Sequence, residues 1–81
     1  MTLRELREQN GKSRAEVAAA LGVTVQAVAR YESGERWLKP EQILLLSNLY
    51  DESAEEIINA QINSRNARED NLRTRRKNHT V

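Results

Sequence analysis

The sequence contains no cysteine, which excludes a disulfide framework and a thiolate metal site as sources of its stability. Its single histidine, His79, has no second histidine or cysteine at metal-ligand spacing, so we expect neither a metal nor a cofactor. The longest run of large apolar residues, Ile43 to Leu46, is far shorter than the ~20 residues that span a bilayer, and no apolar leader opens the chain. We therefore expect a cytoplasmic protein without a membrane segment.

Side chains suited to catalysis are also scarce. An enzyme of this kind would need a nucleophile with a base, or a metal set, and His79 alone supplies neither. Glu55 and Glu56 form the only adjacent pair of glutamates, and they are typical first-turn charges that the helix dipole favours. The sequence therefore predicts a protein that is not an enzyme.

Charge is present but unevenly distributed along the 81 residues, which have room for one small domain. The net charge is +1, yet residues 1–62 hold 7 Lys/Arg and 10 Asp/Glu, whereas residues 63–81 hold 6 and 2. We interpret residues 1–62 as a domain and residues 63–81 as a basic tail. A mildly acidic domain argues against non-specific coating of polyanions and requires any basic contacts to share one face.

Helix signals recur along the domain, whereas alternating strand patterns are absent, so we expect an all-α fold. Capping boxes at Thr2, Ser13 and Ser53, each with a glutamate three residues later, predict three helix starts. Gly22 ends one helix, and Thr24 caps the next only a few residues later. The five predicted helices cover residues 2–9, 14–21, 25–33, 41–50 and a segment from about 53 to 62.

The third predicted helix has two different faces. At 100° per residue, one arc contains Val25, Gln26, Ala29, Arg30 and Ser33, and no acidic residue. The opposite arc contains Ala27, Val28, Tyr31 and Glu32. The pattern suits either an ordinary amphipathic surface helix or a helix that lies in the major groove of DNA, where an outward glutamate would meet phosphates.

Four side chains on the outer arc have the chemistry to contact base edges. Gln26 matches the N6 and N7 atoms of adenine, and Arg30 matches the O6 and N7 atoms of guanine or a phosphate. Val25 suits a thymine methyl group, while the small Ala29 lets the helix approach the bases. The sequence predicts base contacts from Val25, Gln26, Ala29 and Arg30.

Residues 13–34, SRAEVAAALGVTVQAVARYESG, closely resemble the helix-turn-helix of the Cro/phage-repressor (Xre-like) family. The resemblance covers about residues 2 to 60 and is carried by Ala18 and Gly22 at the turn, Leu21 and Val28 in the core, and the ending that starts at Arg30. It implies a five-helix, repressor-like domain that binds a pseudo-palindromic DNA operator as a homodimer and regulates transcription, most simply as a repressor.

The resemblance also implies roles for residues around the third helix. An ion pair between Arg7 and Glu32 would explain a carboxylate on the inner arc. The family usually has basic residues after this helix, where the present chain has Glu35, and we expect Glu35 to point away from DNA. Trp37 either packs under its loop, which we favour, or rests on the sugar-phosphate wall. The predicted backbone contacts are Arg14, Thr24, Ser33, Arg36 and Lys39.

Two regions leave alternatives open. In the fourth helix, Ile43, Leu46 and Tyr50 face the predicted core, and Leu45 and Leu49 form a second strip that either a second copy or the fifth helix covers. The tail is either disordered or a continuation of the fifth helix. It serves either to bind a protein partner, as in an antitoxin or accessory regulator, or to contact DNA through Arg73, Arg75, Arg76 and Lys77.

Overall fold

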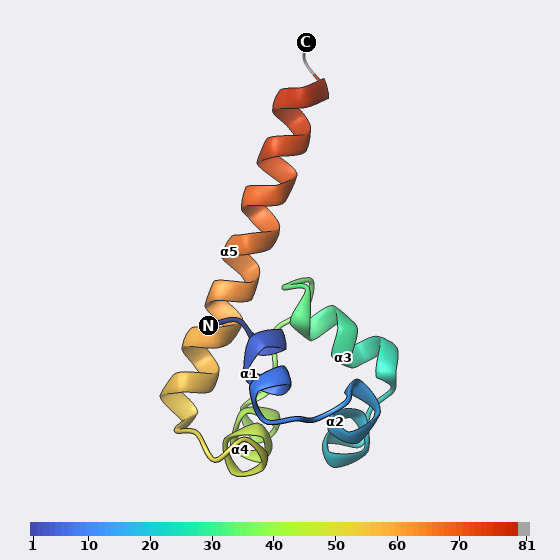
Figure 1. Cartoon of the computed structure of the whole chain (residues 1–81), viewed down its shortest axis with the longest axis vertical. Coiled ribbons are helices and arrows are strands. Elements are labelled where there is room, and N and C mark those ends of the chain that lie inside the picture. Colours follow the sequence, from blue (N-terminus) through green and yellow to red (C-terminus); the bar gives the residue numbers. More distant parts are fainter. Residues whose placement is uncertain (80–81) are drawn as a thin grey trace.

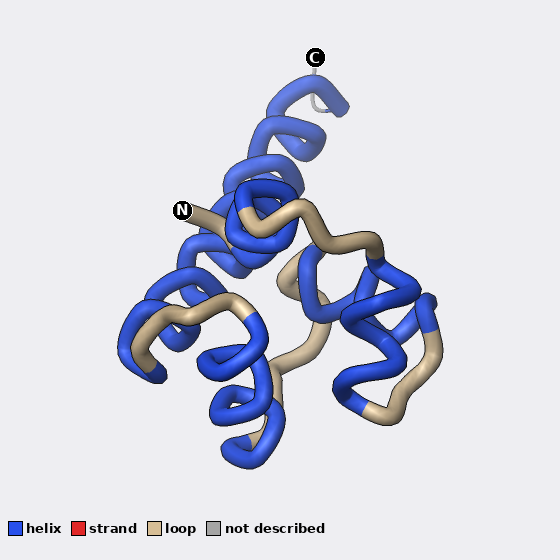
Figure 2. The backbone as a smooth tube through the Cα atoms, turned by 60° about the horizontal axis from the view of Figure 1, so that its bottom comes forward, coloured by secondary structure: helices blue, strands red, loops and turns tan. Residues whose placement is uncertain are grey.

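The computed structural model describes residues 1–79, with side chains through residue 73, and in this part of the chain it is all-α. Its helices are α1 (Leu3–Gln9), α2 (Arg14–Leu21), α3 (Val25–Glu32), α4 (Pro40–Leu49) and α5 (Ala54–His79). The first four helices cluster at the lower end of α5, whose C-terminal half projects beyond them (Figure 1). Short loops join the helices, and no strand is present in the described chain (Figure 2). The all-α prediction is confirmed.

The helix starts follow from local hydrogen bonding. The hydroxyl of Thr2 accepts from the Glu5 amide at 3.3 Å while the Glu5 carboxylate accepts from the Thr2 amide at 2.8 Å. Ser13 and Glu16 form the same reciprocal pair, at 3.1 and 3.0 Å. These two predicted boxes satisfy amides that would otherwise lack partners in the first helical turn, and at the third the Ser53 hydroxyl accepts from the Glu56 amide at 3.1 Å. The hydrogen bonds of the first two boxes also lower the pKa of Glu5 and of Glu16, because they stabilise the ionised form.

The core lies where α1 to α4 meet the first half of α5. Its buried apolar members are Leu3, Leu6, Val17, Ala18, Val28, Leu38, Leu46, Tyr50, Ile57 and Ala60. Ile43 and Leu49 pack against this cluster, whereas Leu44 and Leu45 remain exposed. The prediction that Leu45 and Leu49 form one exposed strip is therefore wrong. Leu49 packs against the core, whereas Leu45 is exposed together with Leu44.

Helix α5 extends far beyond the predicted end near residue 62 and gives the molecule its long axis of 46 Å. The described part of residues 63–81 thus has the helical form, and its first residues are anchored by polar contacts. The hydroxyl of the buried Ser64 accepts from the Leu3 amide at 3.1 Å, and the Asn63 amide donates to the Met1 carbonyl at 2.8 Å. The sequence does not predict that this part of α5 packs against the domain, because it has few apolar residues. The contacts are hydrogen bonds, which an apolar pattern does not reveal.

No helix in the described residues combines the length and the hydropathy needed to cross a membrane.

Candidate DNA-binding interface

The turn between α2 and α3 sets how these helices cross. Gly22 has a φ of +69°, the left-handed conformation in which glycine ends helices at little cost. The Val23 amide then donates to the Ala18 carbonyl at 3.0 Å, and Val23 packs against the core. The hydroxyl of Thr24 accepts from the Ala27 amide at 3.1 Å and starts α3. The turn therefore holds α3 across α2 with one side facing solvent.

Helix α3 has the two faces that its sequence predicts. Val28 is buried, and Tyr31 packs against the core, where its hydroxyl accepts a hydrogen bond from Gln42 at 3.1 Å. On the other face Gln26 and Arg30 are exposed. Val25 is 47% exposed at the start of this face, while Ala29 is half-buried in its middle. The four predicted base contacts thus share one surface.

A buried ion pair fixes the inner side of α3. The Glu32 carboxylate accepts from Arg7 Nε at 2.6 Å and from Arg7 Nη2 at 3.2 Å. The two side chains are only 11% and 6% exposed, and the hydrogen bond that Arg7 donates to Glu32 raises the pKa of Arg7. Arg7 also donates to the Lys12 carbonyl at 3.0 Å. The pairing implied by the family resemblance is confirmed, and it joins α1 to the end of α3.

Arg14, a predicted backbone contact, shares this carboxylate. Its Nε lies 3.3 Å from Glu32 Oε1, while the side chain is 43% exposed. Glu32 thus orients Arg14 at the start of α2 without removing it from solvent. The other predicted backbone contacts are also exposed: Thr24, Ser33, Arg36 and Lys39.

Glu35, which we expected to point away from DNA, lies against the exposed face of α3. Its Oε2 lies 3.8 Å from Arg30 Nε, and both side chains are about half exposed. An open hollow in the surface is lined by Gln26, Ala29, Arg30, Ser33 and Glu35. The loop folds back along α3, and the charge of Glu35, on which the expectation rested, does not indicate this path.

Trp37 is not packed under its loop, the arrangement that its sequence context favours. The residue is 51% exposed, and the guanidinium carbon of Arg65 lies 4.6 Å from the centroid of its ring. Helix α5 therefore covers the ring with a cation, an arrangement in which the ring keeps its other surface in solvent. No sequence pattern connects Trp37 with Arg65, because they are far apart in the chain.

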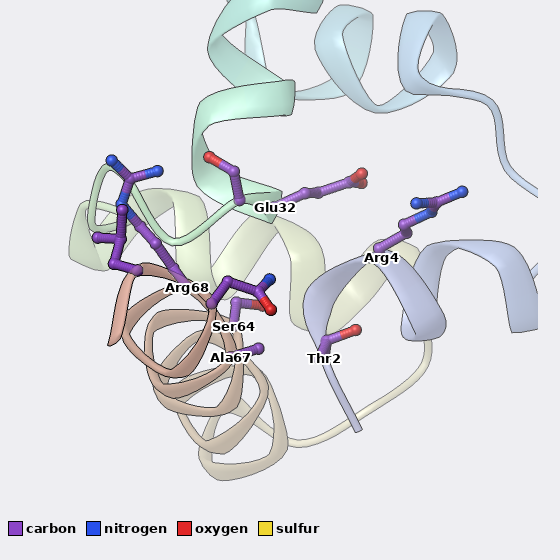
Figure 3. A pocket seen from close by; sticks show the side chains of 9 residues that line it. Thr2, Arg4, Glu32, Ser64, Ala67 and Arg68 are labelled. Atoms are coloured by element: carbon purple, nitrogen blue, oxygen red, sulfur yellow. The ribbon is translucent and has the colours of Figure 1, made fainter. Parts of the chain in front are cut away.

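The structure also contains a polar groove that sequence reasoning missed. It lies between α1, the end of α3 and α5, and its labelled side chains include Arg4 and Arg68 on opposite sides of the opening (Figure 3). Thr2 and Ser64 line the groove between them. No sequence signal marks it, because its members come from three separate segments.

The basic tail contains four further predicted DNA contacts. Arg73 is exposed on α5, and the side chains of Arg75, Arg76 and Lys77 lie outside the described part of the structure. No group of three His, Cys, Asp or Glu side chains in the described residues is placed to hold a metal ion.

Two short helices joined by a tight glycine turn, the second with an exposed polar face, define the helix-turn-helix class of domains. The family model described as Helix-turn-helix matches residues 3–57, so the chain belongs to this family. The predicted resemblance to its Cro/phage-repressor (Xre-like) members is confirmed.

Two curated relatives come from Pyrococcus species. A protein named as an HTH-type transcriptional regulatory protein of Pyrococcus furiosus is 44% identical over 50 residues, which are 62% of this chain and 16% of the relative. A protein of the same description from Pyrococcus abyssi is 39% identical over 57 residues, 70% of this chain and 18% of the relative. The chain thus spans less than a fifth of the length of these relatives. No solved structure matches it.

Proposed function

We propose that this chain is a cytoplasmic, non-enzymatic regulator of transcription that binds double-stranded DNA sequence-specifically and most simply acts as a repressor. The observation that carries the proposal is the exposed face of α3, where Gln26 and Arg30 share a surface with Val25 and Ala29. Gln26 would recognise adenine, Arg30 would recognise guanine, and Val25 would contact a thymine methyl group. Membership of the helix-turn-helix family and the names of the relatives support this function.

Phosphate contacts would set the position of α3 in the groove. Arg14 and Thr24 at the helix starts, and Ser33, Arg36 and Lys39 after the end of α3, are exposed and suited to this role. A body with more acidic than basic residues supports specific rather than general binding, because it provides little long-range attraction to DNA.

We further propose that the protein binds a pseudo-palindromic operator as a homodimer. Four large apolar side chains support self-association, because they are exposed on helices that pack together: Leu44 and Leu45 of α4, and Ile58 and Ile62 of α5. The two α3 helices would then enter successive major grooves, with half-sites about 10 base pairs apart.

A duplex selected from a random library by the wild-type chain provides the test. Replacing Arg30 with Ala should weaken binding to this duplex by about 1–3 kcal/mol, whereas Arg4→Ala, which removes the same charge from α1, should change it much less. Gln26→Ala should relax the preference at one base pair, while Gln9→Ala should not. Arg14→Ala should weaken all duplexes alike. Equal effects of each variant and its control, measured by fluorescence anisotropy, would contradict the proposed face.

A second candidate function is that of an antitoxin or accessory regulator that binds a protein partner through its tail. The C-terminal half of α5 favours this candidate, because it projects from the other four helices (Figure 1). Leu72, which belongs to α5, is 39% exposed and could contact a partner. This role predicts that the full chain captures a partner and that a chain without residues 66–81 does not, while operator binding persists. Capture that is independent of the tail would exclude it.

A further inference from the structure

The loop after α3 returns along the helix rather than leaving it. The Arg30 carbonyl accepts hydrogen bonds from the amides of Glu35, at 3.0 Å, and Arg36, at 3.2 Å. Gly34 has a φ of +78° between them, which turns the chain back. These contacts place the Glu35 side chain next to Arg30, in the hollow that Gln26, Ala29 and Ser33 also line.

Glu35 is the one carboxylate among the five side chains that line this hollow. An ionised carboxylate only accepts hydrogen bonds, whereas a glutamine or arginine donates them. In the major groove, guanine offers two acceptors and thymine offers one, adenine offers the N6 donor beside the N7 acceptor, and cytosine offers the donor amino group N4 alone. A carboxylate on this face therefore opposes guanine, thymine and phosphate oxygens, and favours cytosine, whose donor has no acceptor of the same base beside it.

We propose that Glu35 is a specificity-determining residue that accepts a hydrogen bond from cytosine N4 beside the base that Arg30 contacts. The inference rests on the proposed function and extends it to a residue that departs from the family pattern and that we expected to point away from DNA. Arg30 and Glu35 together then read a guanine and a cytosine, and the carboxylate lowers affinity for duplexes without the cytosine.

The geometry of the Arg30–Glu35 pair argues against a purely structural role. Its closest N–O distance is 3.8 Å and both side chains are about half exposed, so the pair is too long and too solvated to hold either side chain in place. Arg30 can therefore leave Glu35 for a base at little cost. By contrast, the Arg7–Glu32 pair, at 2.6 Å and largely buried, has the geometry of a structural contact.

The experiment compares Glu35→Gln with Glu8→Gln in the full chain. Glu8 is an exposed glutamate of α1 whose Oε1 lies 3.3 Å from Arg4 Nε, so its replacement removes the same charge and the same kind of pair away from α3. Each protein is titrated against the duplex that the wild type selects, all its single-base variants and an unrelated duplex. Circular dichroism checks that both variants are folded.

We expect Glu35→Gln to weaken discrimination by about fivefold or more at one cytosine-containing base pair, and at no other position. Both variants should bind the unrelated duplex slightly more tightly, because each has one negative charge fewer than the wild type. Identical base profiles for the two variants would overturn the role of Glu35 while leaving DNA binding intact. If the wild type selects no duplex at all, the proposed function fails, and the role of Glu35 fails with it.

Discussion

Glu32 connects three helices through one carboxylate. It accepts hydrogen bonds from Arg7 of α1 and Arg14 of α2 while sitting at the end of α3, so the orientation of the exposed face depends on a single buried acid. Removing Arg7 leaves the buried Glu32 carboxylate with Arg14, a longer and more exposed partner, in place of its two-pronged contact. The Arg7–Glu32 pair should therefore contribute more to stability than a surface ion pair does.

Replacing Arg7 with Ala should consequently lower the free energy of unfolding by about 3 kcal/mol or more. The exposed pair between Arg4 and Glu8 provides the matched comparison, and Glu8→Ala should cost at most about 0.5 kcal/mol. Urea denaturation of both variants measures the difference. Similar destabilisation of the two would show that the Arg7 contact is no stronger than a surface pair.

Tyr50 provides a test of the packing between α4 and the rest of the core. Burial, and then the Glu32 carboxylate, raise its pKa from 10.0 to about 12, while Arg7 acts in the opposite direction. Below pH 10 the phenol is neutral in both states and contributes no pH dependence. Between pH 10 and about 12 the unfolded chain loses this proton first, so stability falls as the pH rises.

The stability of the wild type should therefore decrease by about 2 to 3 kcal/mol more than that of Tyr50→Phe across this interval. The variant keeps the other groups that titrate at high pH and so isolates Tyr50. Denaturation at several pH values measures the difference between the two proteins. Parallel stability curves would mean that the hydroxyl is not buried as described.

At the scale of elements, the loop between α3 and α4 is docked closely on α5. A Cβ atom at Gly34 would lie 2.7 Å from both Arg65 Cα and the Ser64 carbonyl oxygen, so the two backbones meet without room for a side chain. Nearby, the Leu38 amide donates to the Gln61 side chain at 2.9 Å. The position of the loop, and hence of Glu35, depends on α5.

Gly34→Ala should destabilise the protein by about 2 kcal/mol or more, because it adds a backbone clash to a left-handed conformation. Gly11 has a similar φ of +66° but nothing within 4 Å of a Cβ, so Gly11→Ala should cost only about 1 kcal/mol. Thermal and urea denaturation compare the two. Equal costs would show that the loop moves away from α5 easily.

Helix capping and helical spacing were sufficient to predict the helices in the first half of the chain. The bounds of α2 were predictable because Ser13 caps its start and Gly22 ends it, and the faces of α3 followed from helical spacing. The positions of Glu35 and Trp37 were not predictable, because each depends on how a loop folds back against another element. The anchoring of α5 by Ser64 was not predictable either, because it is a hydrogen bond to the distant Leu3 amide that no apolar pattern marks.

At the scale of the whole molecule, positive charge gathers toward the end of the sequence. Residues 74–81 include Arg75, Arg76 and Lys77 and no acidic residue. If this end contacts DNA, removing residues 74–81 should reduce the slope of log affinity against log salt by about 0.9 for each phosphate that these side chains neutralise.

Removal of residues 78–81 alone is the control, because it takes away no lysine or arginine. Titrations of both truncated chains at several salt concentrations measure the slopes. An unchanged slope for the longer deletion would exclude a DNA-binding arm and leave the protein-partner role for the tail.

The central claim is that the exposed face of α3 reads DNA sequence. Selection of bound duplexes from a random library by the wild-type chain tests it most directly. We expect enrichment of a pseudo-palindrome whose half-sites are about 10 base pairs apart, centre to centre. A library that remains random after selection, even at low ionic strength, would contradict the claim.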